Sequence, residues 1–175
     1  MLVTLVLNGS TEAFEQIVET YKNQLFSFLL KMTFSRHDAE DILQEVFIRV
    51  YNNLYKYNER WMFSTWIYRI AINTCKSHMK RKKRFTAVPI NDEMPAWPGI
   101  NMNNPEDVFA SKEQRREVVL LIRNLKEKQR VPLILKYVKG FSYSEIGKIL
   151  GISEEAAKMR VMRAKDNICR TYRER

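Results

Sequence analysis

The chain has 175 residues, 45% of them hydrophobic and 29% charged, which is typical of a folded, water-soluble protein. Thirty Lys and Arg against twenty Asp and Glu give a formal net charge of +10, which favours nucleic acid or an anionic membrane surface as partner. The apolar stretch 2–7 is too short for a signal peptide or membrane span, and Cys75 and Cys169 lack a CxxC motif. We therefore expect a cytoplasmic protein with free thiols.

Charge and proline divide the chain into three parts. Residues 1–84 carry 13 basic and 8 acidic side chains, and residues 112–175 carry 17 and 8. Residues 85–111 hold four acids, no Lys or Arg, and four of the five prolines. Because proline removes a backbone donor and disfavours helix at the preceding residue, we expect an extended acidic linker between two basic helical modules.

Three helices are predicted in the first module. One runs from about residue 10 to 32 with Ser10 as N-cap, a second begins near Asp38, and a third begins after Ser64. Their apolar residues recur at helical spacing and should face one shared core: Phe14, Val18, Tyr21, Leu25, Phe28 and Met32, then Ala39, Leu43, Val46, Val50 and Leu54, then Ile67, Ile70, Ala71 and Thr74.

The second helix also carries a polar stripe. Steps of three and four place its members opposite the apolar face: Asp38, Asp41, Glu45 and Arg49, with Gln44 beside them. From the residues alone, this stripe is a solvated surface, a carboxylate metal site or a protein-docking face. No histidine or further acidic cluster accompanies it in sequence, which disfavours the metal site.

Four aromatic residues lie within eight positions, namely Trp61, Phe63, Trp66 and Tyr68. They are too many for one helical face, so some cap the bundle or form a platform on which unpaired bases stack. The same helix continues into residues 76–84, where six of nine positions are Lys or Arg. Aromatic rings beside a basic helix end are what single-stranded DNA requires.

The second module contains a helix-turn-helix pattern. Helices are expected around Val118, Val119, Ile122 and Leu125, then around Val131, Ile134, Leu135 and Val138, with a stop at Gly140. A short helix through Ile146, Ile149 and Leu150 precedes a turn at Gly151, and Ser153 should cap the final helix. That helix would bury Ala157, Val161, Ala164 and Ile168 and present a basic face to the major groove: Lys158, Met159, Arg160, Met162, Arg163 and Lys165.

Three motifs in this order resemble the extracytoplasmic-function (ECF) sigma factors of the sigma-70 family. They are DAEDILQEVF at 38–47, FSTWIYRIAIN at 63–73 and the helix-turn-helix. The resemblance covers about residues 11–168. It implies an all-α protein with a sigma-2 domain of three to four helices over 1–84, an acidic linker over 85–111 and a four-helix sigma-4 domain over 112–175.

The resemblance also implies roles for particular residues. Asp38, Asp41, Gln44 and Glu45 match the helix that docks on the polymerase β′ subunit. Another group matches the regions that melt the −10 element and hold its DNA: Trp61, Phe63, Ser64, Thr65, Trp66, Tyr68, Asn73, Lys76, Lys80 and Arg81. Lys158, Met159, Arg160, Met162, Arg163 and Lys165 match the recognition helix on the −35 element.

Partners follow from the same resemblance. It implies a sigma factor, not an enzyme, that is monomeric when free, needs no metal or cofactor, and binds core RNA polymerase through β′ and β, and promoter DNA. It implies a stress response controlled by an anti-sigma factor, which can hold the protein at the inner face of the membrane. The acidic linker would occupy the path of nascent RNA.

Two alternatives remain from the residues alone. One is a stand-alone regulator that binds duplex DNA through its helix-turn-helix, which leaves the aromatic cluster and acidic linker unexplained. The other is a metal-dependent nuclease using Asp38, Asp41 and Glu45, against which the sequence offers only His37 and His78 and no HExxH or P-loop motif.

Overall fold

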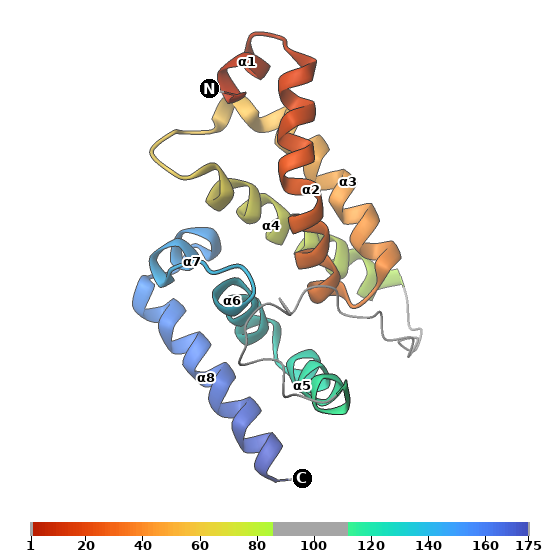
Figure 1. Cartoon of the computed structure of the whole chain (residues 1–175), viewed down its shortest axis with the longest axis vertical. Coiled ribbons are helices and arrows are strands. Elements are labelled where there is room, and N and C mark those ends of the chain that lie inside the picture. The colour runs from red at the N-terminus through yellow and green to blue at the C-terminus, as the bar shows by residue number, and fades with distance from the viewer. Residues whose placement is uncertain (1, 86–111, 175) are drawn as a thin grey trace. The chain divides into compact units, whose positions relative to one another are not determined.

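The computed structural model describes the backbone of residues 2–85 and 112–174, and the side chains of residues 2–82 and 117–174 (Figure 1). The described part is helical without strands, which confirms the predicted all-α fold. The chain divides into two compact units, Met1–Ala96 and Trp97–Arg175. The predicted linker lies outside the described residues except for Phe85, which is the last residue of a helix.

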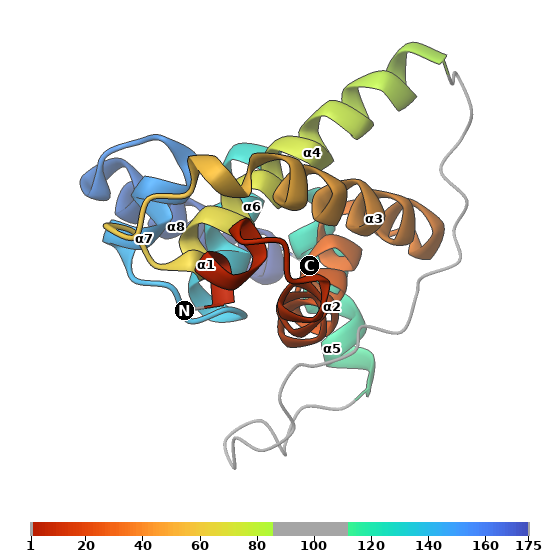
Figure 2. The same cartoon turned by 90° about the horizontal axis from the view of Figure 1, so that it is seen from above.

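The first unit is a small helical bundle. Its elements are α1 (Leu2–Leu7), α2 (Thr11–Thr33), α3 (Arg36–Asn53), a 3-10 turn (Leu54–Lys56) and α4 (Phe63–Phe85). Helix α3 packs against both α2 and α4, and Figure 2 shows the basic C-terminal end of α4 projecting from the bundle. The core is aliphatic and aromatic, with no exposed surface at Leu25, Phe28, Leu29, Ile42, Val46, Val50 and Ile67.

Local capping chemistry defines the corner between α2 and α3. Phe34 adopts φ 56°, in the left-handed region, and its N–H donates to the Leu30 carbonyl at 2.9 Å to close α2. Ser35 then accepts from the Asp38 N–H at 3.2 Å and caps α3, which therefore begins at Arg36, slightly before the predicted start. Ser10 caps α2 in the same way, as predicted.

The buried face of α2 differs from the predicted one in its N-terminal half. Ala13 and Ile17 are buried there, whereas Phe14 and Val18 are only partly covered. The Phe14 ring instead packs edge-on against Tyr51 of α3, with ring centroids 5.0 Å apart. The predicted stripe is therefore rotated by one residue in this half, while Leu25, Phe28 and Met32 are buried as predicted.

The second unit contains α5 (Lys112–Asn124), α6 (Glu127–Tyr137), α7 (Tyr143–Leu150) and α8 (Glu154–Arg173). Helix α8 packs against the other three (Figure 1). One apolar cluster joins them through Leu125, Leu133, Val161 and Ala164, with Ile122, Tyr143 and Ile168 packed around it. Val118 and Val138, which helped to mark two of the predicted helices, lie outside this core with exposed fractions of 38% and 37%.

Candidate functional site

A pocket of about 430 Å³ opens in the first unit beside the predicted aromatic cluster. Residues from α3, the 3-10 turn, the following loop and α4 line it: Arg49, Asn53, Lys56, Asn58, Trp61, Trp66, Arg69, Ile70 and Asn73. Three of the predicted DNA-melting residues, Trp61, Trp66 and Asn73, are thereby brought together. Its lining combines two indole rings with three cations and, among the described residues, includes no carboxylate.

This composition suits a nucleotide. An unpaired base can stack on an exposed aromatic face, and Arg or Lys can neutralise the adjoining phosphates. Arg49, Lys56 and Arg69 were absent from the predicted set, and the first two come from elements other than the helix that carries Trp66 and Asn73. Two of them had a sequence signal, since Arg49 belongs to the polar stripe of α3 and Arg69 shares a helical face with Trp66 and Asn73. Nothing in the local pattern distinguishes Lys56 from other surface cations.

An aromatic cluster supports the wall of this pocket. The Phe63 ring lies 5.5 Å from Trp66 and 5.4 Å from Tyr21, measured between centroids. Tyr57 contacts both Phe63 and Trp66, at 5.2 and 5.4 Å. Phe63 is therefore a packing residue behind Trp66, and Trp66 has a dual position, half in the cluster and half in the pocket.

Two predicted DNA contacts are buried. Tyr68 has an exposed fraction of 2%, and its ring packs edge-on against Phe28 at 5.2 Å. Thr65 is equally buried, and Ser64 is partly covered. Tyr68 and Thr65 cannot reach a base in this fold, so their prediction as base-capturing residues is corrected to a role in the core of the bundle.

The basic end of α4 is partly neutralised within the protein. Lys76, Lys80 and Arg81 are exposed, as a DNA-backbone surface requires. Arg81, however, donates to Glu45 of α3 at 3.0 Å, and Lys82 donates to Asp38 at 2.6 Å. Two of the cations counted from the sequence are therefore paired with carboxylates and are not free for DNA. The side chains of residues 83–85 lie outside the described residues.

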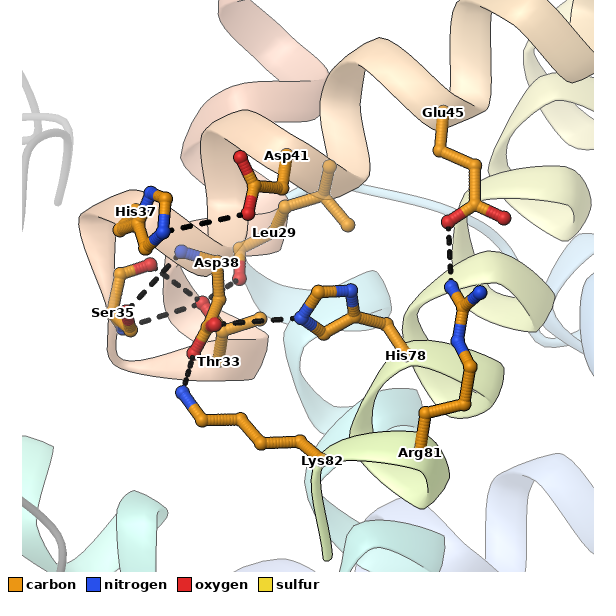
Figure 3. A network of polar contacts seen from close by, with 10 residues as sticks. All are labelled: Leu29, Thr33, Ser35, His37, Asp38, Asp41, Glu45, His78, Arg81 and Lys82. Atoms are coloured by element: carbon orange, nitrogen blue, oxygen red, sulfur yellow. Dashed lines mark hydrogen bonds and ion pairs between the residues drawn. The ribbon is translucent and has the colours of Figure 1, made fainter. Parts of the chain in front are cut away.

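The polar stripe of α3 is split between solvent and the interior. Asp41 and Gln44 are exposed, and the Asp41 carboxylate lies 3.6 Å from the more exposed His37. Asp38 is buried with an exposed fraction of 5%, so its prediction as a member of a surface stripe is wrong. The reason is that α4 crosses α3 at its first turn and covers this position (Figure 3).

Asp38 is the centre of a polar network between the two helices (Figure 3). One carboxylate oxygen accepts from Lys82 Nζ at 2.6 Å, and the other lies 3.4 Å from His78 Nε2. Burial alone would raise the pKa of Asp38, but the Lys82 ammonium and hydrogen bonds from Ser35 and His78 outweigh it, so this pKa is lowered. Asp38 therefore stays charged and fastens the N-terminus of α3 to the end of α4.

Glu45 forms a second connection two turns further along α3. Its Oε1 accepts from Nη2 and Nε of Arg49 at 2.6 and 3.0 Å, and its Oε2 accepts from Arg81 Nη2. Burial would raise the pKa of Glu45, but the two guanidinium groups lower it overall. Because these cations occupy Asp38 and Glu45 while Asp41 faces His37, the three carboxylates do not converge on a metal position, and no metal-binding cluster occurs among the described side chains.

The helix-turn-helix of the second unit is stabilised by two serine N-caps, a glycine at the turn and a close backbone contact. Ser142 and Glu145 form a reciprocal capping box at the start of α7. Gly151 adopts φ 67° at its end, as the predicted turn requires, and Ser153 caps α8. A Cβ on Gly147 would stand 2.8 Å from the Ile152 carbonyl oxygen, so α7 and the turn approach each other more closely than a side chain permits.

The predicted recognition face of α8 is open. Ala157, Val161 and Ala164 are buried, as predicted. The predicted groove-facing residues lie on the opposite side, exposed at Lys158, Met159, Met162, Arg163 and Lys165 and partly covered at Arg160. Lys165 also approaches the Tyr137 ring, with Nζ 5.7 Å from its centroid. One helix face therefore offers cations and thioethers, with Glu155 and Asp166 at its two ends.

Family comparison agrees with both units. Residues 17–85 match the Sigma-70 region 2 model, and residues 113–168 match the Sigma-70 region 4 model. The chain is 33% identical over 177 aligned positions to the ECF RNA polymerase sigma factor SigW of Bacillus subtilis (strain 168), covering 97% of this chain and 94% of the relative. It belongs to the ECF sigma factors. The sigma-E factor of Escherichia coli (strain K12) is 30% identical over 96% of the chain and 91% of its own length.

Solved structures support the fold of this ECF sigma factor. CnrH in complex with the cytosolic domain of CnrY matches with a TM-score of 0.72 and 20% identity, over 99% of this chain and 96% of that one. The sigma factor RpoE in complex with the anti-sigma factor NepR from Bartonella quintana gives 0.71 and 21%, over 90% and 95%. At these identities the likeness establishes the fold of the ECF sigma factor alone.

As an ECF sigma factor, the chain is a transcription initiation factor, and the pocket and open helix face lie within the two matched regions. Region 2 contains Trp61, Trp66, Arg69 and Asn73, and region 4 contains α8 up to Ile168. Within the described residues, no helix is both long and apolar enough to cross a membrane.

Proposed function

We propose that this ECF sigma factor opens promoters by capturing an unpaired −10 nucleotide in the pocket of the first unit, while α8 of the second unit reads the −35 element. The observation that carries the proposal is the cation-and-indole lining of the pocket, built from Arg49, Trp61, Trp66 and Arg69. Stacking and phosphate neutralisation together favour single-stranded DNA over duplex, since the faces of paired bases are already covered.

The α8 surface supports duplex recognition at the −35 element. Arg163 and Lys158 are exposed and can contact guanine edges or phosphates, while Met159 and Met162 can touch thymine methyl groups. The packing of α8 on three other helices fixes which face of the helix these side chains occupy. We include Arg160 and Lys165 as contacts to the DNA backbone, because both lie at the margin of this face.

Core RNA polymerase is the proposed protein partner, bound through its β′ and β subunits by a factor that is monomeric when free. Asp41 and Gln44 are the exposed members of the predicted docking residues and supply the docking surface. Glu45 contributes only through the part of its carboxylate left open by two guanidinium groups. Asp38 is left out of this surface because α4 covers it.

The test is reconstitution with core polymerase and a promoter library. We expect stoichiometric binding to core polymerase and initiation at a narrow class of promoters. Tight binding of the isolated protein to duplex DNA without binding to core polymerase would instead identify a stand-alone regulator and refute the proposal.

Residue-level tests use matched arginine pairs. Arg69→Ala should reduce open-complex formation, whereas Arg60→Ala, an exposed arginine outside the pocket lining, should not. If Arg163 reads a base, Arg163→Ala should reduce the binding free energy that distinguishes the preferred base at one −35 position by about 1–3 kcal/mol. Arg173→Ala, in the last turn of the same helix, is its control. A uniform loss across all −35 variants would make Arg163 a phosphate contact.

Regulation by an anti-sigma factor is part of the proposal, as is a cytoplasmic location at the inner face of the membrane when that factor is membrane-anchored. The support is that RpoE and CnrH, which share this fold, are seen in complex with an anti-sigma factor and a cytosolic domain respectively. The test is transcription by the reconstituted holoenzyme with each co-encoded membrane protein. Full transcriptional activity in the presence of every one of these membrane proteins would refute regulation by an anti-sigma factor, and with it the proposed stress-response role.

A further inference from the structure

Tyr57 stands at the junction between the 3-10 turn and the loop that carries Trp61. The centroid of its ring lies 5.4 Å from that of the Trp66 ring and 5.2 Å from that of the Phe63 ring. Its hydroxyl donates to the Trp61 carbonyl at 2.6 Å, across the base of the loop. A single side chain therefore touches both of the elements that supply the indole rings of the pocket.

Hydrogen bonds within the loop also shape it. Asn58 accepts from the Arg60 N–H through its side chain at 3.0 Å and from the Trp61 N–H through its carbonyl at 3.1 Å. These bonds close a tight turn, but both are internal to the loop and do not attach it to the bundle. The Trp66 N–H donates to the Met62 carbonyl at 3.3 Å and joins the end of the loop to α4, while the Tyr57 hydroxyl links Trp61 to a ring that packs on Trp66.

We propose that Tyr57 is a positioning residue for nucleotide capture, which rests on the function proposed above. Its ring packs against the Trp66 ring and sets the orientation of that indole. Its hydroxyl holds the Trp61 carbonyl and so sets the position of the Trp61 indole at the mouth of the pocket. The spacing between the two indoles then decides which unpaired base is accepted. Tyr57 makes no contact with DNA in this scheme and acts only through Trp61 and Trp66.

The hydroxyl can donate at any pH at which the protein works. Burial raises the pKa of Tyr57, and the nearby Glu59 carboxylate raises it further, so the phenol stays protonated. The acceptor is a backbone carbonyl, so the bond depends on Tyr57 and not on the identity of the residue at position 61. Removing the hydroxyl while keeping the ring therefore separates its two contributions.

The test compares Tyr57→Phe with Tyr55→Phe. The control makes the same chemical change two residues earlier, on an exposed tyrosine outside the pocket lining. Three quantities are measured: amide hydrogen exchange of residues 58–62 in the free protein, affinity for core polymerase, and open-complex yield across single-base variants of the −10 element.

For Tyr57→Phe, the loss of one hydrogen bond should speed exchange of the loop about two- to tenfold. The ratio of open-complex yields between the preferred −10 base and its competitors should fall by a similar factor. The affinity for core polymerase should be unchanged. Tyr55→Phe should match the wild type in all three measurements.

Unchanged loop exchange, or faster exchange with unaltered −10 preferences, would overturn the role of Tyr57. Failure of the proposed function is distinguishable from either result. In that case the wild-type holoenzyme would give no open complex at any promoter, or Arg69→Ala would behave like Arg60→Ala.

Discussion

Replacing Asp38 by Asn should destabilise the first unit, whereas the same change at Asp41 should not. Asp38→Asn keeps the shape of the side chain and removes its charge, leaving Lys82 and His78 without their shared anion. Hydrogen bonds to charged groups contribute about 1.5–3 kcal/mol, but exposed ion pairs contribute only about 0–1 kcal/mol. The Asp38 side chain is 8% exposed and Lys82 48%, so we expect an intermediate loss of about 1–2 kcal/mol.

Thermal unfolding followed by circular dichroism measures this loss. For a domain of 60–100 residues, about 1 kcal/mol corresponds to about 4–8 °C in Tm. Asp41 lies 3.6 Å from an exposed histidine, so Asp41→Asn should change Tm little while weakening the complex with core polymerase. Equal Tm values for Asp38→Asn and the wild type, or an equal fall for both variants, would refute the reasoning from burial.

The pH dependence of this contribution has a definite sign. Because the pKa of Asp38 is lowered in the folded protein, the unfolded chain binds its proton more readily. The stabilisation is therefore fully present above the ordinary aspartate pKa of about 3.9 and is lost as the pH falls through the lowered folded value. The Tm difference between Asp38→Asn and the wild type should accordingly narrow in acid and stay constant near neutral pH.

Three further predictions concern packing and capping. Gly147→Ala should destabilise the helix-turn-helix by about 1–3 kcal/mol in thermal unfolding of the full chain, since its Cβ would meet the Ile152 carbonyl at 2.8 Å. Ser142→Ala should lower the free energy of unfolding by about 1 kcal/mol in the same assay, because α7 loses its N-cap. This cost should shrink in acid because hydrogen bonds from Ser142 lower the pKa of Glu145. Trp66→Ala should lower both Tm and open-complex yield, and a change in yield without one in Tm would contradict its place in the aromatic cluster.

Features governed by neighbouring residues in the sequence were predictable. The caps Ser10 and Ser153 and the turn at Gly151 were predicted and are confirmed, because a hydroxyl bonding to an N–H three residues later, or a glycine with positive φ, is determined locally. The open basic face of α8 follows in the same way from the buried positions Ala157 and Val161, which fix the rotation of the helix.

Features governed by distant residues were not predictable. Asp38 pairs with a lysine 44 positions later, and periodicity along α3 carries no trace of the helix that covers it. Two cations of the pocket, Arg49 and Lys56, likewise come from elements other than the helix that carries Trp66. Tyr68 is a different case, because it shares a stripe at steps of three and four with Ala71, and its burial was available from helical periodicity.

The connection through Glu45 shows how one helix can serve two surfaces. Asp41 and Gln44 face solvent from α3, and one residue further on the Glu45 carboxylate turns toward two guanidinium groups. One of these, Arg49, lines the pocket, and the other, Arg81, belongs to the basic end of α4. Because a guanidinium bonded to a carboxylate has lost part of its side-chain freedom before any ligand arrives, Glu45 preorganises both cations at the expense of part of their charge. The helix that carries the proposed docking residues is thus also the scaffold that orients the cations of the proposed DNA-binding surface.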